Sequence, residues 1–332
     1  MHIQRDVTDE ERELLRAMAG DAASRDSERK RARAVLKFLE TGDTSAAAEA
    51  ARLSESTVRK WVRLFDAEGW QRLLAVHQPR GGDFLARYDQ GFWAERLAGG
   101  YLDRSWDYRA VPYGTSRSEP FTDMETFREY AVGEFMLQAW SADQRWKRPD
   151  LVTIPRSVLR QRAGHDEWIP DLIHWDNERC QVYVSQAAAA IEVETSLWMV
   201  GRATKPLSYT VKEEDIAALR NWVSATHVPL YIMQVFYDEA HVVGFAHLEE
   251  LIGETVPEGE PVEAEVDETT GKATYMVPLD EGVRLGAIPE PDVEGRVFKA
   301  ENGRVTVYGR LVGSQIMATS RDVLERLAAG EL

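Results

Sequence analysis

A cluster of helix-breaking residues at positions 77–82, with the sequence HQPRGG, divides this chain into two parts that fold differently. In the first part, apolar residues recur at helical spacing and no strand-like run is present. In the second part, short apolar runs alternate with helical patterns, which favours an α/β core with a mixed sheet. We therefore predict an all-α domain over residues 1–82, an α/β domain over residues 83–252, and a β-rich C-terminal extension over residues 253–332 that packs on the α/β domain.

Charge is unevenly distributed between these parts. The 332 residues include 40 Lys and Arg against 56 Asp and Glu, a net charge of −16. Residues 1–82 carry 15 of the basic and 14 of the acidic residues, so the excess acidity lies in the rest of the chain. This balance argues against indiscriminate binding of nucleic acid, but it leaves room for a local DNA contact in the first domain.

Composition also narrows the expected compartment. A single cysteine, Cys180, rules out a disulfide scaffold and fits a reducing environment. No apolar run approaches about 18 residues, so no membrane span is expected. The first residues, MHIQRDVTDEERELL, are charged where a secretion signal needs an apolar stretch. We expect a cytoplasmic protein without a membrane partner.

The sequence AAAEAARLSESTVRKWVRLF at positions 46–65 has the layout of two helices joined by a short turn. Small residues in the first helix let the second helix pack closely, and Ser56 is expected to cap the second helix. That helix places its cations opposite its apolar side, where they can contact phosphates and base edges in a major groove. The candidate DNA-binding residues are Ser56, Arg59, Lys60 and Arg63.

With its flanks, over residues 29–82, this stretch resembles the helix-turn-helix arm of bacterial insertion-sequence transposases. That arm usually continues into a basic, proline-rich tail, of which only Pro79 and Arg80 are present here. The resemblance implies DNA binding. A plain three-helix bundle that serves protein contacts is the alternative.

Acidic residues in the second part form a candidate metal site. In the run Ile191-Glu192-Val193-Glu194, a strand would project both glutamates from one face and the valine toward a core. Asp171, 21 residues before Glu192, can converge on it from the start of a neighbouring strand. Carboxylate oxygens gathered at one point are what Mg²⁺ requires. Such an ion stabilises charge on a scissile phosphate and lowers the pKa of an attacking water.

This constellation resembles the PD-(D/E)xK nuclease superfamily, whose core runs helix, three strands, helix, strand. The chain would supply these as a helix over 123–140, strands near 151, 172 and 190, a helix over 212–225, and a strand over 230–236. The superfamily has a lysine where this chain has Glu194, as in the glutamate variant of some type II restriction enzymes. Glu194 could act as a base or second metal ligand, and Lys212 or Lys205 could approach from elsewhere.

A second Pro-Asp pair, Pro149-Asp150, competes with Asp171 for the role of metal-binding aspartate. The expected order of the core puts the aspartate at the start of the second strand, which favours Asp171. Asp150 stays the alternative. The candidate catalytic residues are therefore Asp171, Glu192, Glu194 and Asp150, with Mg²⁺ held by Glu192 and one or both aspartates.

Residues 145–250 as a block look like type II restriction endonucleases of the AccI-like group. The resemblance implies site-specific cleavage of double-stranded DNA, and because such sites are usually palindromic, a two-fold homodimer is expected. Three arginines among aromatic and turn residues are further candidates for DNA contacts, namely Arg104, Arg109 and Arg117. Most tryptophans are expected in the core, although three could stack on bases, namely Trp106, Trp146 and Trp198.

We therefore predict a bacterial, Mg²⁺-dependent restriction endonuclease with a restriction-endonuclease-like α/β core and an N-terminal helix-turn-helix that assists target binding. The alternative is a helix-turn-helix transcriptional regulator whose α/β part is an inactive descendant of a nuclease, because the motif lysine is missing. A transposase-like recombinase is a third possibility, suggested by residues 1–82 alone, but the chain lacks a convincing carboxylate spacing for it.

Overall fold

The computed structural model describes most of the chain and divides it into two compact units. The described residues are 3–20, 26–74, 81–114, 121–141, 146–163, 170, 172–253, 262, 264–266 and 273–332. The first unit comprises Met1–Gln78 with Arg128–Ala142, and the second comprises Pro79–Phe127 with Asp143–Leu332. Each unit has its own core and is described by itself.

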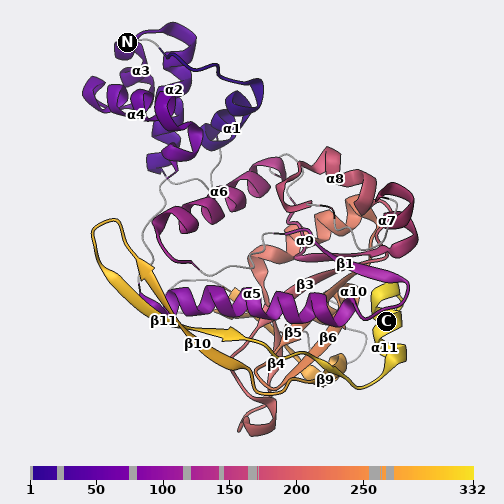
Figure 1. Cartoon of the computed structure of the whole chain (residues 1–332). Helices are drawn as coiled ribbons and strands as arrows, with labels where there is room; N and C mark the ends of the chain where they lie inside the picture. Colours follow the sequence, from indigo (N-terminus) through magenta and orange to yellow (C-terminus); the bar gives the residue numbers. More distant parts are fainter. Residues whose placement is uncertain are drawn as a thin grey trace. The chain divides into compact units, whose positions relative to one another are not determined.

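The first unit is helical (Figure 1). Its apolar core is formed by the inward faces of the first four helices and a short 3₁₀ helix, with Val132 and Phe135 of α6 packed against them. Small residues of α3, Ala47 and Ala51, are buried there beside Val58 of α4, as the helix-turn-helix pattern predicts. The elements are α1 (Asp9–Gly20), α2 (Asp26–Thr41), α3 (Thr44–Ala51), α4 (Glu55–Glu68), η1 (Trp70–Leu73) and α6 (Met124–Ser141).

A seven-stranded mixed sheet organises the second unit, in the order β1-β2-β3-β5-β6-β9-β12. Strands β3 and β5 are parallel, while the other neighbouring pairs are antiparallel. Helix α9 (Glu213–Thr226) lies in the connection between the parallel pair. The strands are β1 (Tyr108–Pro112), β2 (Leu151–Pro155), β3 (Ala189–Thr195), β5 (Leu230–Val235), β6 (Glu239–Gly244), β9 (Val283–Ala287) and β12 (Met317–Ala318).

Both faces of this sheet are covered. On one face, Ala190 and Ile232 pack against a layer that includes Trp222 of α9. On the other face, Ile191 and Met233 pack against α5 (Gly82–Leu102) and α11 (Arg321–Ala329). The helices on the first face are α7 (Arg156–Ala163), α8 (Asn177–Val184), α9 and α10 (Phe245–Ile252), with η2 (Leu172–His174) beside them.

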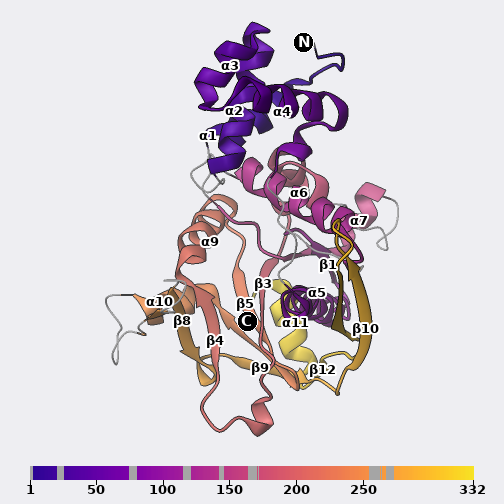
Figure 2. The same ribbon diagram turned by 90° about the vertical axis from the view of Figure 1, so that its left-hand side faces the viewer.

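Helix α5 is enclosed between the main sheet and a two-stranded ribbon, β10 (Asp292–Lys299) with β11 (Val305–Val312) (Figure 2). A Cβ at Gly82, the first residue of α5, would lie 2.7 Å from the Val307 carbonyl oxygen, so the close approach of helix and ribbon requires glycine there. The remaining elements are β4 (Ser208–Lys212), β7 (Ala264–Val266) and β8 (Ala273–Pro278), which form a three-stranded sheet, with the 3₁₀ turns η3 (Val200–Arg202) and η4 (Leu279–Glu281).

The mixed α/β architecture with N-terminal helices is confirmed, but two elements that the sequence suggested for the core are not there. Residues 172–174 form the 3₁₀ helix η2 instead of a strand. The Arg148 guanidinium donates to the carbonyl oxygens of Leu172 (3.0 Å) and Trp175 (2.8 Å), so these groups do not enter a ladder. The helix over 123–140 forms, but Arg128–Ala142 belongs to the first unit, and α5 is the helix that precedes the strands β1, β2 and β3.

The domain limits differ in part from the expected ones. The first boundary between the units follows Gln78 and lies within the breaker cluster at positions 77–82. Residues 253–332, expected as an extension packed on the α/β domain, supply β9 and β12 to the main sheet itself. They therefore share a single compact unit with the preceding residues.

Candidate functional site

Strand β3 carries the two glutamates on one face. Val193 packs against the core cluster on the α5 side of the sheet, whereas Ala190 faces the α9 side. Since side chains alternate along a strand, Glu192 and Glu194 project on the α9 side with Ala190. The predicted opposition of Val193 to the two glutamates is confirmed.

Asp150 lies directly before β2, where it meets Glu192. Leu151 pairs with Ile191 in the antiparallel ladder, so Asp150 and Glu192 are the next positions along the two strands. The Asp150 carboxylate accepts a hydrogen bond of 2.7 Å from the Val193 N–H. Its carbonyl accepts hydrogen bonds from the N–H groups of Tyr113 (2.8 Å) and Gly114 (3.2 Å). Backbone contacts on both sides therefore fix this aspartate at the sheet edge.

The first turn of α9 adds a third carboxylate to the two on β3. One oxygen each from Glu192, Glu194 and Asp215 lie within 4.8 Å of one another. The Lys212 ammonium, at the end of β4, lies 4.0 Å from Asp215. Asp215 is not among the residues predicted from the sequence, because acidic residues in the first turn of a helix are also what the helix macrodipole favours.

Lys147 is a second residue of the site that was not predicted from the sequence. Its ammonium donates hydrogen bonds to Glu192 Oε1 and to Asp215 Oδ2, the latter at 3.0 Å. These partners stand 45 and 68 residues away in the chain. The only local signal for Lys147 is its position three residues before Asp150, and this spacing is not part of the motif from which the site was predicted. An amine is thus present among the carboxylates, supplied from outside the expected motif position.

The electrostatics of the cluster favour a bound cation. Burial, reinforced by the charges of Glu192 and Glu95, raises the pKa of the Asp150 carboxyl well above its usual range. Burial and the neighbouring Glu192 raise the pKa of Glu194 to about 7. For Lys147, burial alone would lower the pKa, but the surrounding carboxylates outweigh burial and raise the pKa of its ammonium. Several negative charges that are buried close together produce pKa shifts in these directions.

The residues present fit a divalent metal ion. Glu192 is only 4% exposed, and its Oε2 is buried without a hydrogen-bond partner among the residues that the structure describes. A buried carboxylate oxygen without a donor is costly unless a cation satisfies it. The donor set consists of hard carboxylate oxygens, which suit Mg²⁺. Glu192, Glu194 and Asp215, whose oxygens lie within 4.8 Å of one another, could hold such an ion, and Asp150 lies beside Glu192 in the sheet.

The competing aspartate, Asp171, lies outside the described residues. The strand that was to position it is instead η2, so the topological reason for preferring Asp171 over Asp150 is lost. Asp150, by contrast, precedes β2 and lies next to Glu192 in the sheet.

In the first unit, helix α4 presents the predicted basic face. Arg59, Lys60 and Arg63 are all exposed, and Arg59 forms an ion pair with Glu55 one turn earlier. The predicted cap is wrong by two residues, because the hydroxyl of Ser54 accepts the capping hydrogen bond from Thr57 N–H. Ser56 lies exposed in the first turn of α4. The turn before α4 is sharp, with Arg52 in the left-handed conformation at φ 53°.

Two of the three candidate arginines make contacts within the second unit. Arg104 donates to the Ile316 carbonyl and lies over the Tyr101 ring. Arg109 lies 3.3 Å from the Asp103 carboxylate. Arg117 lies outside the described residues. The structure therefore brings neither Arg104 nor Arg109 into the contacts of the carboxylate cluster.

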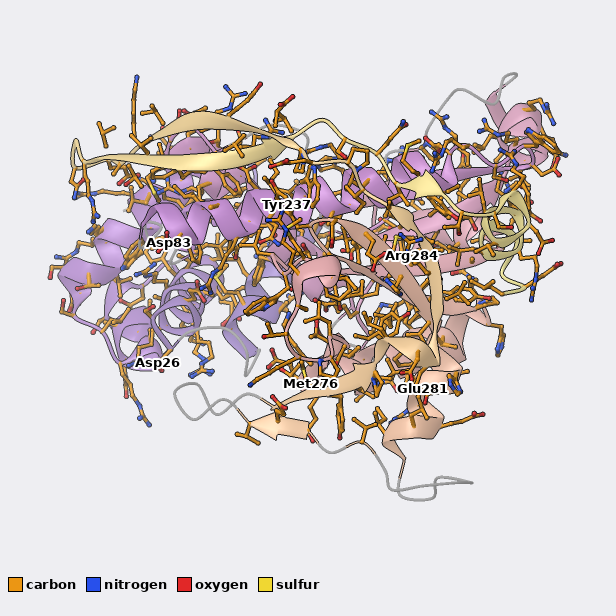
Figure 3. All side chains as sticks on the ribbon, turned by 90° about the horizontal axis from the view of Figure 1, so that it is seen from below. Asp26, Asp83, Tyr237, Met276, Glu281 and Arg284 are labelled. Atoms are coloured by element: carbon orange, nitrogen blue, oxygen red, sulfur yellow. The ribbon has the colours of Figure 1, made fainter. Side chains whose placement is uncertain are left out.

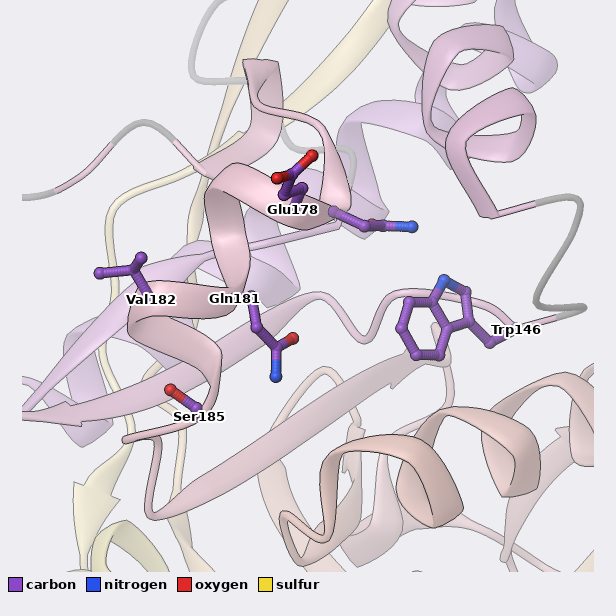
Figure 4. A pocket seen from close by; sticks show the side chains of 6 residues that line it. Trp146, Glu178, Gln181, Val182 and Ser185 are labelled. Atoms are coloured by element: carbon purple, nitrogen blue, oxygen red, sulfur yellow. The ribbon is translucent and has the colours of Figure 1, made fainter.

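An open pocket of 520 Å³ lies beside α8 and is lined by Trp146 on one side and by residues of α8 and its C-terminal end, including Glu178, Gln181 and Ser185, on the other (Figure 4). Trp146 is the neighbour of Lys147 in the chain, but none of the site carboxylates lines this pocket. The candidate metal site is thus separate from this pocket.

Comparison with known families identifies the N-terminal part. The family model of a helix-turn-helix domain matches residues 30–83. No curated protein and no solved structure matches the chain. The chain therefore contains a helix-turn-helix DNA-binding domain at its N-terminal end. Among the described residues, no helix has the length and apolar character needed to cross a bilayer.

Proposed function

We propose that this protein is a Mg²⁺-dependent endonuclease of the restriction type, which hydrolyses double-stranded DNA at a specific sequence. The observation that carries the proposal is the carboxylate group of Glu192, Glu194 and Asp215, in a chain that also has a DNA-binding domain. The Lys147 ammonium is bonded to Glu192 and Asp215, and Asp150 lies beside Glu192 in the sheet. Acidic side chains grouped this tightly repel a phosphodiester unless a cation lies between them. A metal-assisted phosphoryl reaction makes use of that grouping.

The order of elements supports the same reading. Helix α5, the antiparallel strands β1, β2 and β3, helix α9, and β5 parallel to β3 come in this order along the chain, as helix, three strands, helix, strand, with α6, α7, α8 and β4 inserted between them. This is the order that the resemblance to PD-(D/E)xK nucleases implies. Pro149-Asp150 stands at the start of the second strand and Glu192 on the third, at the positions where that resemblance places the acidic residues.

In the proposed mechanism, Asp150 and Glu192 would hold Mg²⁺. The bound ion would stabilise negative charge on the phosphate and lower the pKa of the attacking water. The role of the missing motif lysine passes to Lys147, whose ammonium reaches the cluster from the segment before β2 and can orient the water or a phosphate oxygen. Glu194, whose pKa burial raises to about 7, suits proton acceptance near neutral pH.

The DNA-binding domain would supply affinity for the target. Arg59, Lys60 and Arg63 of α4 would contact phosphates and base edges in the major groove. We further propose a two-fold homodimer in the bacterial cytoplasm, which would place one site on each strand of a palindrome. Light scattering would then report twice the chain mass of 37.6 kDa.

A digest of a plasmid library, with sequencing of the ends, tests the proposed activity. The wild-type protein should cut at one sequence with Mg²⁺ and stop in EDTA, and Glu192→Ala should not cut. Glu265→Ala, which changes an exposed acid on β7, serves as the matched control and should cut like wild type. If the folded wild-type protein and Glu192→Ala bind DNA equally and neither cuts, the nuclease proposal is wrong and a transcriptional regulator is the better account.

A further inference from the structure

The segment between β3 and β4, residues 196–207, exposes two adjacent large apolar side chains. Leu197 is 62% and Trp198 is 67% exposed. By contrast, Trp93 and Trp222 are fully buried in the cores on either side of the main sheet. Adjacent exposed leucine and tryptophan side chains indicate a surface that binds a partner, since neither contributes to the core.

Hydrogen bonds anchor the backbone of this segment to the turn between β5 and β6. The Asp238 carboxylate accepts hydrogen bonds from the N–H groups of Val200 (2.8 Å) and Gly201 (3.0 Å). The Trp198 carbonyl accepts one of 3.1 Å from the N–H of Tyr237. Tyr237 and Asp238 lie in the turn between β5 and β6 (Figure 3). A surface fixed in this way loses little conformational entropy when a partner binds.

The charge of the segment points to a polyanionic partner. Residues 195–212 contain Arg202, Lys205 and Lys212 and no acidic residue, in a chain whose net charge is −16. Arg202 and Lys205 are exposed on the same segment as the apolar pair. Such cations neutralise phosphates, while an aromatic ring on the same segment can stack on a base.

The position of the segment connects it with the candidate site. Leu197 and Trp198 follow within three residues the end of β3, the strand that carries Glu192 and Glu194. The segment projects beyond the sheet at the bottom of Figure 2. DNA bound along the C-terminal end of β3 would therefore pass this segment.

We infer that Leu197 and Trp198 form a wedge that inserts between base pairs of duplex DNA, while Arg202 and Lys205 contact the flanking phosphates. This inference rests on the proposed function, because it takes the DNA held at the carboxylate cluster as the partner. Apolar side chains that enter the base stack unwind and kink the duplex, and the flanking cations offset the cost of unstacking. The wedge would thus bend the target next to the scissile bond.

Unwinding can be measured without cleavage or knowledge of the target sequence. A nicked plasmid is sealed by DNA ligase in Mg²⁺ in the presence of saturating Glu192→Gln protein, which should not cut it, and its linking number is read on a gel. The inference predicts a shifted linking number relative to religation without protein. Adding Trp198→Ala to the Glu192→Gln protein should abolish the shift while plasmid binding persists, and adding Trp198→Phe instead should retain most of it.

Val307→Ala in the same background is the matched control. Val307 is 68% exposed, like Trp198, but lies on β11 of the ribbon that covers α5, so its loss should leave the shift unchanged. A plasmid that is bound without any shift, or a shift that survives Trp198→Ala, overturns the wedge. The two proposals fail separately: absence of Mg²⁺-dependent cutting by wild type counts against the nuclease, whereas the linking number reports on the wedge alone.

Discussion

At the scale of single residues, Lys147 is the group on which the proposed chemistry most depends. Its ammonium links Glu192 to Asp215, carboxylates from two different elements. If it orients the water or a phosphate oxygen, Lys147→Gln should slow cleavage by about 10²–10⁴-fold, the usual range for a positioned proton-transfer group. DNA affinity in EDTA should change little.

The matched control for Lys147 is Lys299→Gln, which removes an exposed lysine at the end of β10. This variant should cleave at the wild-type rate. Initial rates of plasmid nicking in Mg²⁺ measure both changes. Wild-type rates in a folded Lys147→Gln protein would show that the amine has no part in the reaction.

A second residue-scale prediction concerns His241 on β6. Burial lowers the pKa of its imidazole below the ordinary 6.5, against the opposing charge of Glu239 and with help from Arg284. Below pH 6.5 the unfolded chain therefore binds a proton that the folded chain resists, so this histidine makes folding less favourable as pH falls. Removal of the imidazole should relieve this acid sensitivity.

His241→Leu tests the expected sign. The melting temperature of the variant minus that of wild type should become more positive between neutral pH and about pH 5, the range in which an ordinary histidine titrates. The measurement is thermal unfolding followed by circular dichroism across that range. A difference that is constant with pH would contradict the assigned shift.

At the scale of elements, helix α4 of the DNA-binding domain makes a separable prediction. Arg63 is exposed on its basic face, so Arg63→Ala should weaken DNA binding and reduce the slope of log affinity against log salt by about 1. Arg16→Ala, on the exposed side of α1, is the control and should bind like wild type. Fluorescence anisotropy in EDTA measures both. Equal salt slopes in the two variants would place the DNA contact elsewhere.

The pairing of β9 with β12 makes another prediction at this scale. A Cβ at Gly286 would overlap the Met317 carbonyl of the neighbouring strand, whereas a Cβ at Gly295 on β10 meets no described atom within 4 Å. Gly286→Ala should therefore destabilise the fold by about 1–3 kcal/mol, as overpacking does. Gly295→Ala should be neutral or slightly stabilising. Urea unfolding distinguishes them, and equal midpoints would show that β12 yields without cost.

Some elements could be predicted from the sequence because their signals are local. The alternation of Glu192, Val193 and Glu194 specifies a strand with two unlike faces, and that strand forms. Asn-Gly is a common hairpin turn, and Asn302-Gly303 joins β10 to β11 with Gly303 at φ 81°. The layout of α3 and α4 followed from small residues facing the apolar side of a basic helix.

Other features depend on tertiary contacts that leave no local mark. Helix α5 carries no amphipathic stripe, because it is buried between the sheet and the ribbon and is therefore apolar on more than one side. The apolar run at residues 172–175 looks like a strand, but Arg148 takes up its carbonyl groups. Lys147 acquires its partners only when β2, β3 and α9 come together.

In the whole molecule, each of the two units contains one of the two sites that the proposed function requires. The helical unit contains the DNA-binding domain and the α/β unit contains the carboxylate cluster. The chain's net charge of −16 is compatible with a DNA partner because α4 is locally basic and the acids at the sheet edge are suited to a cation. Binding should thus be local, salt-sensitive and metal-assisted.

The central claim is that Asp150, rather than Asp171, completes a metal-dependent site for DNA cleavage with Glu192. The most direct test is the rate of plasmid cleavage in Mg²⁺ by wild type, Asp150→Asn and Asp171→Asn, with EDTA as the metal-free arm. Wild type and Asp171→Asn should cut in Mg²⁺ but not in EDTA, and Asp150→Asn should not cut. Cleavage by a folded Asp150→Asn protein at the wild-type rate, or no cleavage by any of the three, would contradict it.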